Sequence, residues 1–302
     1  MKHSNFGYQL TLFDDFDTSD RVVNVASVPQ RSPFRYPGGK TWLIPRIRQW
    51  LASIKKKPTT FIEPFAGGAI VGLTVAFEKH AEHVILVELD KQVAAVWQTI
   101  LGGEAEWLAD RILNFDLTQT SVQEILASET SNIREKAFQT ILKNRTYHGG
   151  ILAPGSGLIK KGESGKGLKS RWYPQTLANR IRSIGQIRNR FTFICGDGIS
   201  VMKDCIDDKN AAFFIDPPYT AGNQKSKRAG RRLYTHYEID HDLLFDISEK
   251  SSGNILLTYE NSPDIEELSN RHFFKTKCVA MKNTHHDKMT ELLISRDLHW
   301  FK

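Results

Sequence analysis

The sequence has 302 residues, of which 40% are hydrophobic and 25% are charged, a composition typical of one globular domain or one domain with an insertion. Its net charge of +7 favours a polyanionic partner. The three cysteines show no CxxC spacing, so we expect neither disulfides nor a metal site. No apolar run reaches membrane-spanning length and no signal-peptide pattern is present, which predicts a cytoplasmic protein without a membrane partner.

Residues 1–30 are expected to form a flexible N-terminal extension, because a run of aspartates and small polar residues is unsuited to a core. Within it, Gln9-Leu10-Thr11-Leu12-Phe13 places a polar residue before two leucines and a phenylalanine. This pattern resembles the short motif with which bacterial replication and repair proteins dock on the DNA sliding clamp, so a clamp is a candidate partner. The alternative is that the segment packs on the rest of its own chain.

Two segments in the first quarter of the chain combine glycines with residues that can contact a ligand. Tyr36-Pro37-Gly38-Gly39-Lys40 precedes a helix with an apolar stripe from Ile44 to Ile54. A strand followed by a loop is predicted over 59–66 and a helix over 67–79. The junction between them is Glu63-Pro64-Phe65-Ala66-Gly67-Gly68-Ala69, the glycine loop. Bare backbone at a helix N-terminus suits an anionic cofactor group. The loop also approximates a dinucleotide-binding fingerprint, and the first segment alone could be an ordinary turn with an exposed lysine.

An acidic residue ends the next predicted strand, which covers 84–88. Glu88 follows the glycine loop by about 20 residues, the spacing at which a carboxylate binds ribose hydroxyls. Asp90 is the alternative for this role, and Glu88 would otherwise be a surface carboxylate that caps the helix starting near Lys91. The spacing favours ribose binding by Glu88.

From Leu101 the pattern changes to two or three helices, followed by a basic, glycine-rich stretch. Between 143 and 190 there are eleven Lys or Arg residues and one acidic residue, Glu163. Five of the basic residues are candidate contacts for DNA phosphates: Lys160, Lys161, Lys166, Lys169 and Arg171. The alternative, a solvated basic face, leaves the glycines and the near absence of acids unexplained.

Two further predicted strands, 191–195 and 211–215, are each followed by an aspartate, Asp197 and Asp216. The second strand is apolar throughout, as expected of a parallel strand buried on both faces, and it stops at Asp216-Pro217-Pro218-Tyr219 because proline cannot donate to a sheet. Ligands bind at the carboxyl ends of such strands. A basic segment over 222–232, with Lys225 and Arg228 as candidate DNA contacts, precedes a predicted helix over 239–250 and predicted strands over 254–259 and 289–295.

Asp216-Pro217-Pro218-Tyr219 resembles the catalytic motif of amino-methylating DNA methyltransferases. Asp216 and the Pro217 carbonyl could accept hydrogen bonds from an exocyclic amine and aim its lone pair at a methyl donor. Tyr219 could stack on a base flipped out of the duplex. Together with Tyr36–Lys40 and the glycine loop, the order of motifs resembles the Dam-like D12 class of N6-adenine DNA methyltransferases, although Ala69 stands where that family has the last glycine of the loop.

This resemblance implies a doubly wound, Rossmann-like α/β methyltransferase sheet with a helical and hairpin insertion for DNA recognition. It implies S-adenosyl-L-methionine as the cofactor and double-stranded DNA as the substrate, and it places Arg145, in the segment Lys143–Gly150, among the DNA contacts. The implied cofactor contacts are Tyr36, Lys40, Phe65, Gly67, Glu88, Asp197 and Asp216.

These inferences divide the chain into an extension (1–30), a first catalytic part (31–101), a target-recognition insertion (102–187) and a second catalytic part (188–302). They predict a bacterial or phage enzyme that methylates N6 of adenine in DNA by base flipping and direct in-line transfer. An N4-cytosine methyltransferase would use the same motif, a nicotinamide oxidoreductase fits the glycine loop, and a non-catalytic DNA-binding regulator fits the charge. The order of the motifs favours the adenine methyltransferase.

Overall fold

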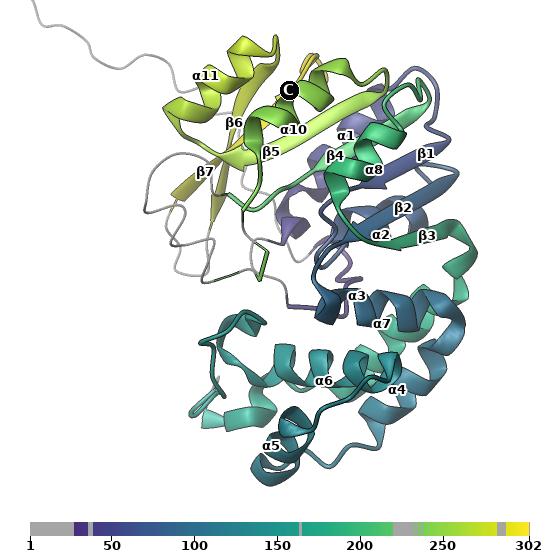
Figure 1. The fold of residues 1–302 in the computed structure, drawn as a ribbon, viewed down its shortest axis with the longest axis vertical. Coiled ribbons are helices and arrows are strands. Elements are labelled where there is room, and N and C mark those ends of the chain that lie inside the picture. Colours follow the sequence, from purple (N-terminus) through teal and green to yellow (C-terminus); the bar gives the residue numbers. More distant parts are fainter. Residues whose placement is uncertain are drawn as a thin grey trace, which may run out of the picture.

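The computed structural model describes residues 27–35, 39–162, 165–219, 233, 235–236, 238–282 and 288–301. Its sheet has seven strands in the order β3-β2-β1-β4-β5-β7-β6 (Figure 1). The strands are β1 (Thr60–Glu63), β2 (His83–Glu88), β3 (Phe191–Cys195), β4 (Ala211–Ile215), β5 (Asn254–Glu260), β6 (Lys275–Lys282) and β7 (Lys288–Ser295). β1 to β5 pair in parallel, and β7 runs antiparallel to both β5 and β6. The doubly wound α/β sheet predicted from the sequence is therefore confirmed.

Helices flank the sheet and also form a separate layer below it in Figure 1. The helices are α1 (Ile44–Ser53), α2 (Ile70–Phe77), α3 (Lys91–Thr99), α4 (Ala105–Leu113), α5 (Gln119–Ala127), α6 (Ile133–Thr146), α7 (Pro174–Gln186), α8 (Gly198–Asp204), α10 (His241–Lys250) and α11 (Pro263–Arg271). α4 to α7 form the lower layer, where α3 packs against α6 and α4 packs against α7. None of the helices that the structure describes combines the length and apolar character needed to cross a membrane.

Side chains of β4 alternate between two hydrophobic cores, one on each face of the sheet. Ala212 and Phe214 belong to the core that includes α1, α2 and α3, whereas Phe213 and Ile215 belong to the core that includes α8, α10 and α11. All five residues of β4 are buried. This explains why the strand is a continuous apolar run in the sequence rather than an alternating one.

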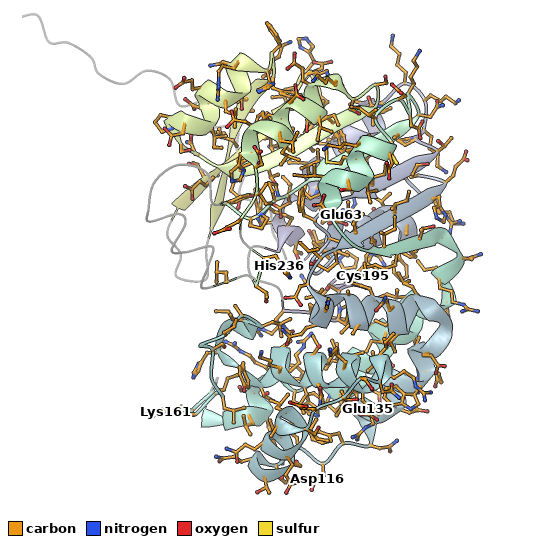
Figure 2. The ribbon with its side chains drawn as sticks, viewed as in Figure 1. Glu63, Asp116, Glu135, Lys161, Cys195 and His236 are labelled. Atoms are coloured by element: carbon orange, nitrogen blue, oxygen red, sulfur yellow. The ribbon has the colours of Figure 1, made fainter. Side chains whose placement is uncertain are left out.

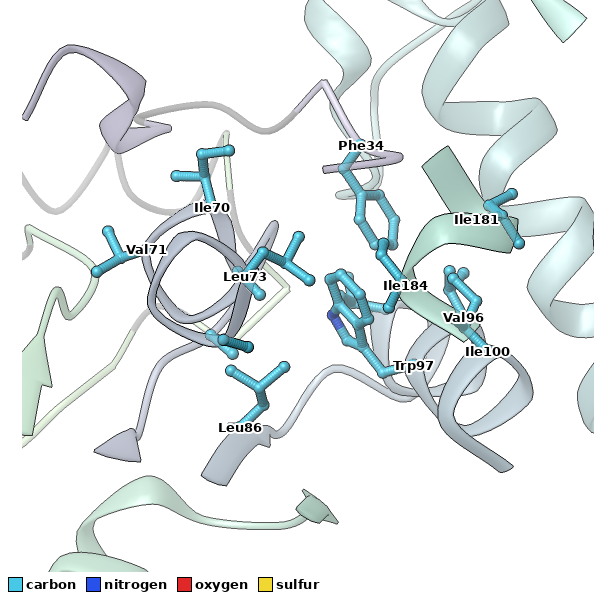
Figure 3. Packing of buried hydrophobic residues seen from close by; sticks show 14 of the residues in the cluster. Phe34, Ile70, Val71, Leu73, Leu86, Val96, Trp97, Ile100, Ile181 and Ile184 are labelled. Carbon is cyan, nitrogen blue, oxygen red and sulfur yellow. The ribbon is translucent and has the colours of Figure 1, made fainter. Parts of the chain in front are cut away.

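An apolar layer joins the sheet to the lower helices through α3 (Figure 3). Trp97 of α3 is fully buried, its ring lies 5.7 Å from that of Phe34, and its Nε1 donates to the Gly67 carbonyl at 2.9 Å. Ile181 and Ile184 of α7 belong to the same cluster. The glycine loop is thus anchored to a layer shared by the sheet and the helices.

The structure differs from the sequence-based expectation at α2 and β6, and it adds the helices α7, α8 and α11, which were not predicted. α2 begins at Ile70 rather than at 67, because Gly67 and Ala69 adopt positive φ values of 47° and 50° that a continuing helix excludes. β6 was not predicted, since its lysines and exposed positions hide the apolar pattern of a strand. The predicted positions Gln9–Phe13, Tyr36, Lys225 and Arg228 lie outside the described residues.

Candidate active site

A cavity of about 880 Å³ lies at the carboxyl ends of β1, β2, β3 and β4. The strand order reverses between β1 and β4, which is where open α/β sheets bind ligands. Each of these four strands contributes a carboxylate to the cavity lining: Glu63, Glu88, Asp197 and Asp216. In Figure 2, Glu63 and Cys195 mark this edge of the sheet, and His236, another lining residue, lies near them.

Asp216 sits at the end of β4 in a network of donors. Its Oδ1 accepts a hydrogen bond from the Thr258 hydroxyl at 2.7 Å, and its Oδ2 lies 3.0 Å from Lys40 Nζ. Lys40 begins a short 3-10 helix, and its side chain is buried. The structure therefore brings together Lys40 and Asp216, which are 176 positions apart in the sequence, as an ion pair between a buried lysine and a half-buried aspartate beside the cavity.

The other motif residues take different orientations. Pro218 lines the cavity and Pro217 is buried. The ring of Tyr219 stacks on Tyr259 of β5 at a centroid distance of 5.7 Å, and its hydroxyl lies 2.9 Å from Asp216 Oδ1. Tyr219 therefore turns toward β5 in this structure rather than toward the cavity.

Glu291 of β7 joins this network, and the sequence did not point to it as a site residue. Its side chain is 7% exposed, and its Oε2 lies 3.2 Å from the Tyr219 hydroxyl and 3.5 Å from Lys40 Nζ. Burial raises the pKa of Glu291 to about 7, an effect that Lys40 opposes and the charge of Asp216 reinforces. The only signal in the sequence was an acidic residue inside a predicted apolar strand.

Glu88 holds the glycine loop through backbone hydrogen bonds. Its Oε2 accepts from the Gly67 N–H and its Oε1 from the Asp90 N–H, both at 2.8 Å. Burial raises the pKa of Glu88 to about 7 against the lowering effect of these bonds. Asp90, the alternative ribose ligand, instead caps α3 by accepting from Gln92 and Val93. Asp90 therefore caps α3, and it lines the cavity together with Glu88.

Two further carboxylates complete the strand-end set. Glu63 is buried, and its Oε2 accepts from the Gly72 N–H at 2.7 Å; burial raises its pKa well above the usual range. A Cβ on Gly72 would lie 2.5 Å from that oxygen, so only glycine fits there. Asp197 caps α8 by accepting from the Ser200 N–H at 2.9 Å. Phe65 and Gly67, the predicted loop contacts, also line the cavity.

The predicted DNA contacts fall into two groups. Arg145 and Arg171 line the cavity, and Arg145 is buried with its Nη2 donating to the Pro33 carbonyl. The second group consists of exposed lysines that do not line the cavity: Lys160, Lys161, Lys166 and Lys169. Figure 2 shows one of them, Lys161, at the outer edge of the lower helical layer. Among the described residues there is no cluster of three His, Cys, Asp or Glu side chains placed to bind a metal.

A family model for D12 class N6 adenine-specific DNA methyltransferases matches residues 36–284. The chain belongs to this family. It is 22% identical over 277 residues to the DNA N-6-adenine-methyltransferase of Escherichia phage P1, an alignment that covers 86% of this chain and 34% of that protein. The chain thus spans about a third of the length of this relative.

Solved structures of methyltransferases are similar to this chain with lower sequence identity. The rRNA methyltransferase aviRa from Streptomyces viridochromogenes has 15% identity and a TM-score of 0.40, with 94% of each chain covered. A SAM-dependent methyltransferase from Agrobacterium tumefaciens has 9% identity and a TM-score of 0.39, with 85% of this chain and 62% of that chain covered. For this member of the D12 family, the matched residues include the glycine loop and Asp216–Tyr219.

Proposed function

We propose that this protein transfers a methyl group from S-adenosyl-L-methionine to the N6 amino group of adenine in double-stranded DNA. The observation that carries the proposal is the position of Asp216 and Pro218 at the end of β4, in one cavity with the glycine loop and Glu88. Membership of the D12 family and the similarity to the phage P1 protein support adenine as the target base.

The residues around the cavity fit the cofactor. Glu88 would accept hydrogen bonds from the ribose hydroxyls and Asp197 from the adenine amino group of the cofactor, with Phe65 and Gly67 forming the loop beside it. Tyr36 and Lys40 complete the proposed contacts, although Tyr36 lies outside the described residues. A cavity of about 880 Å³ is large enough for the cofactor and a target base. When bound, the cofactor supplies an electrophilic methyl group.

Asp216 is proposed to orient the reacting amine and to receive its proton. Thr258, Tyr219 and Lys40 hold the carboxylate in place. Its Oδ1 already accepts from the two hydroxyls, whereas Oδ2, which contacts Lys40, retains a lone pair for the amino group. The Pro217 carbonyl is the second proposed acceptor. These two acceptors would turn the nitrogen lone pair away from the ring system. As the new N–C bond forms, the bond between the methyl group and the sulfur of the cofactor would break and S-adenosylhomocysteine would leave. The amine would release one proton, which Asp216 would accept.

Base flipping is part of the proposal, and it is supported by the position of Asp216 in the cavity lining, which an adenine stacked in a duplex would not reach. Tyr219 is the proposed stacking partner of the extruded base. Its ring is in contact with Tyr259, and Lys40 Nζ lies 5.1 Å from its centroid.

The lysines of the insertion are proposed to contact DNA phosphates outside the cavity. Their four side chains lie along a short stretch that leads to Arg171 at the cavity wall. A row of solvent-facing charges suits sequence-independent backbone contact, whereas the arginines at the cavity suit contacts near the target base. Lys225 and Arg228 are proposed further contacts in a segment outside the described residues.

The deciding experiment measures transfer of labelled methyl groups to DNA and identifies the modified base after digestion. N6-methyladenine is expected, whereas N4-methylcytosine would select the alternative target. Asp216→Ala should reduce the transfer rate by roughly 10²–10³ or more, while Asp246→Ala, a change at an acid of α10 that pairs with Lys250, should not. If the wild-type protein transfers no methyl group to any DNA but still binds it, the non-catalytic regulator becomes the better assignment.

A sliding clamp is a proposed second partner, on the basis of Gln9–Phe13 alone. Docking would raise the local concentration of the enzyme near freshly replicated DNA. The measurement is a binding titration of a peptide spanning 5–17 against a bacterial clamp, with Leu12→Ala/Phe13→Ala as the matched control. Equal binding by both peptides, or none at high micromolar concentration, would contradict clamp docking.

A further inference from the structure

The helical wall of the cavity carries four arginines from separate parts of the chain. Arg35 precedes the segment outside the described residues, Arg145 belongs to α6, Arg171 ends a short 3-10 helix, and Arg180 belongs to α7. Burial, with a smaller contribution from the charges of Arg180, Arg35 and Arg171, lowers the pKa of Arg145 to about 9. Each of the three other arginines therefore lies close enough for its positive charge to act on Arg145.

Arg145 is the innermost member of this group. The residue is 5% exposed, its Nη2 donates to the Pro33 carbonyl, and its buried Nε has no hydrogen-bond partner among the described residues. Arg180 Nη1 donates to the Ser32 carbonyl at 3.0 Å. These carbonyl contacts position the guanidinium groups without neutralising them. A buried donor without a partner, inside a cluster of like charges, is unfavourable unless an anion binds there.

Asn144 fixes the geometry of the cluster. Its Oδ1 accepts from the Arg35 N–H at 2.8 Å, and its Nδ2 donates to the carbonyls of Arg35 at 3.0 Å and Gly150 at 2.7 Å. Gly150 has a φ of 73°, and a Cβ there would lie 2.5 Å from the Arg35 carbonyl oxygen. The backbone that carries Arg35 is thus locked against α6, so the cluster is organised before any ligand binds.

The cavity is polarised between its two walls. Carboxylates occupy the strand-end wall, where Glu88 and Asp216 are proposed to bind hydroxyl and amino groups. Arginines occupy the helical wall, and the lysines of the insertion precede one of them, Arg171, in the sequence. A nucleotide turned out of a duplex has the same polarity, with an amino group on the base and an anionic phosphate on the backbone. Guanidinium groups are the side chains best suited to bidentate contact with phosphate oxygens.

We propose that Arg35, Arg145, Arg171 and Arg180 form a single seat for one backbone phosphate next to the target adenine; this arginine seat rests on the proposed function. Binding of the phosphate satisfies the buried Nε of Arg145 and neutralises part of the cluster. The seat fixes the distance between the strand backbone and Asp216. The arginine seat therefore holds the extruded nucleotide, whereas the lysines of the insertion hold the surrounding duplex.

The test replaces single phosphates by uncharged methylphosphonates in a duplex that carries the methylated site mapped in DNA from expressing cells. Binding is measured with S-adenosylhomocysteine present. For the wild-type protein, one of the phosphates flanking the target adenine should show an affinity loss of roughly 10-fold to 100-fold, as expected for a charged hydrogen-bonded contact. Arg180→Met should bind the unmodified duplex more weakly than the wild-type protein does. Introducing that methylphosphonate should then reduce the affinity of the variant much less than it reduces the affinity of the wild-type protein.

Arg182→Met is the matched control, because Arg182 lies on the same helix but pairs with Glu106 and Asp110 of α4. For Arg182→Met, the methylphosphonate should reduce the affinity for the duplex as much as it does for the wild-type protein. If the wild-type protein methylates the duplex but binds every methylphosphonate version equally well, the arginine seat is refuted and the activity stands. If it methylates no DNA, the proposed function and the seat both fail.

A second outcome would also overturn the seat. If Arg180→Met weakens binding of S-adenosylhomocysteine measured by calorimetry without DNA, and leaves the methylphosphonate loss intact, the arginines hold the carboxylate of the cofactor instead. Unchanged cofactor affinity together with a smaller methylphosphonate loss is the result expected from a phosphate seat.

Discussion

Glu291→Gln should make the stability of the protein less sensitive to pH. Two carboxylates, Asp216 and Glu291, share the single ammonium group of Lys40, at 3.0 Å and 3.5 Å. Asp216 lies closer to the ammonium group than Glu291 does, and Glu291 is the more buried of the two carboxylates. The pKa of Glu291 rises from 4.5 to about 7, mainly through burial and also through the charge of Asp216, against the lowering effect of Lys40. At 1.36 kcal/mol per pKa unit, this rise corresponds to roughly 3 kcal/mol.

The sign follows from proton linkage. The folded protein holds the proton of Glu291 to a higher pH than the unfolded chain, so between about pH 4.5 and pH 7 the folded state binds more protons. The contribution of Glu291 to stability is fully present below about 4.5 and is lost as the pH rises through about 7. Glutamine keeps an acceptor for the Tyr219 hydroxyl but does not titrate, so the variant lacks this loss.

Urea unfolding at pH 5 and pH 8 measures the difference. Between these two values the free energy of unfolding should fall by about 2.5 kcal/mol more in the wild type than in Glu291→Gln, slightly less than the full shift because pH 5 lies above the unfolded pKa. Glu88, whose pKa is also about 7, contributes equally to both proteins and cancels. Glu260→Gln, at the position opposite Glu291 in the β5–β7 register, controls for removing a charge at this end of the sheet. The same pH dependence in wild type and Glu291→Gln would refute the reasoning.

Three other changes test the remaining parts of the site. Gly72→Ala should lower the free energy of unfolding by about 1–3 kcal/mol, despite the better helix propensity of alanine, because the new methyl group meets Glu63 and Leu86; unfolding curves equal to wild type would show that the space exists. Glu88→Ala should weaken cofactor binding measured by calorimetry by about 1.5–3 kcal/mol, and unchanged affinity would remove Glu88 from the ribose. The last change substitutes alanine for all four lysines of the insertion, Lys160, Lys161, Lys166 and Lys169. The slope of log affinity for DNA against log salt concentration should become shallower by roughly 0.9 for each phosphate that the variant no longer binds. An unchanged slope would mean that these lysines do not face DNA.

The parallel strands could be predicted because burial on both faces leaves an apolar run that ends abruptly. β4 is the clearest case, since Ala211–Ile215 is apolar and the prolines that follow cannot continue a sheet. The pairing order of the strands could not be obtained from periodicity, because it depends on which runs meet in space. β6 escaped prediction because a strand at the edge of a sheet, with several lysines, needs no apolar alternation.

Strand-end carboxylates such as Glu88 and Asp216 could be predicted because the carboxyl ends of parallel strands converge at one edge. Glu291 and Arg180 could not, since their importance comes from partners far away in the sequence: Glu291 lies beside Lys40, and Arg180 beside Arg145. The orientation of Tyr219 was also beyond the sequence, because stacking on Tyr259 and on a base are equally compatible with an aromatic residue after two prolines.

Asn144 and Arg145 show why the wall opposite the strands needed a structure to interpret. The sequence assigns this pair to DNA recognition, yet the side-chain hydrogen bonds of Asn144 reach the backbone of Arg35 and Gly150. Arg145 in turn donates to the Pro33 carbonyl. The pair therefore fixes the chain just before the segment that leads to Lys40, on which Asp216 depends. A substitution at Asn144 that impairs catalysis would thus not by itself demonstrate a DNA contact, whereas the methylphosphonate comparison separates the two roles, because it changes the DNA and leaves the protein intact.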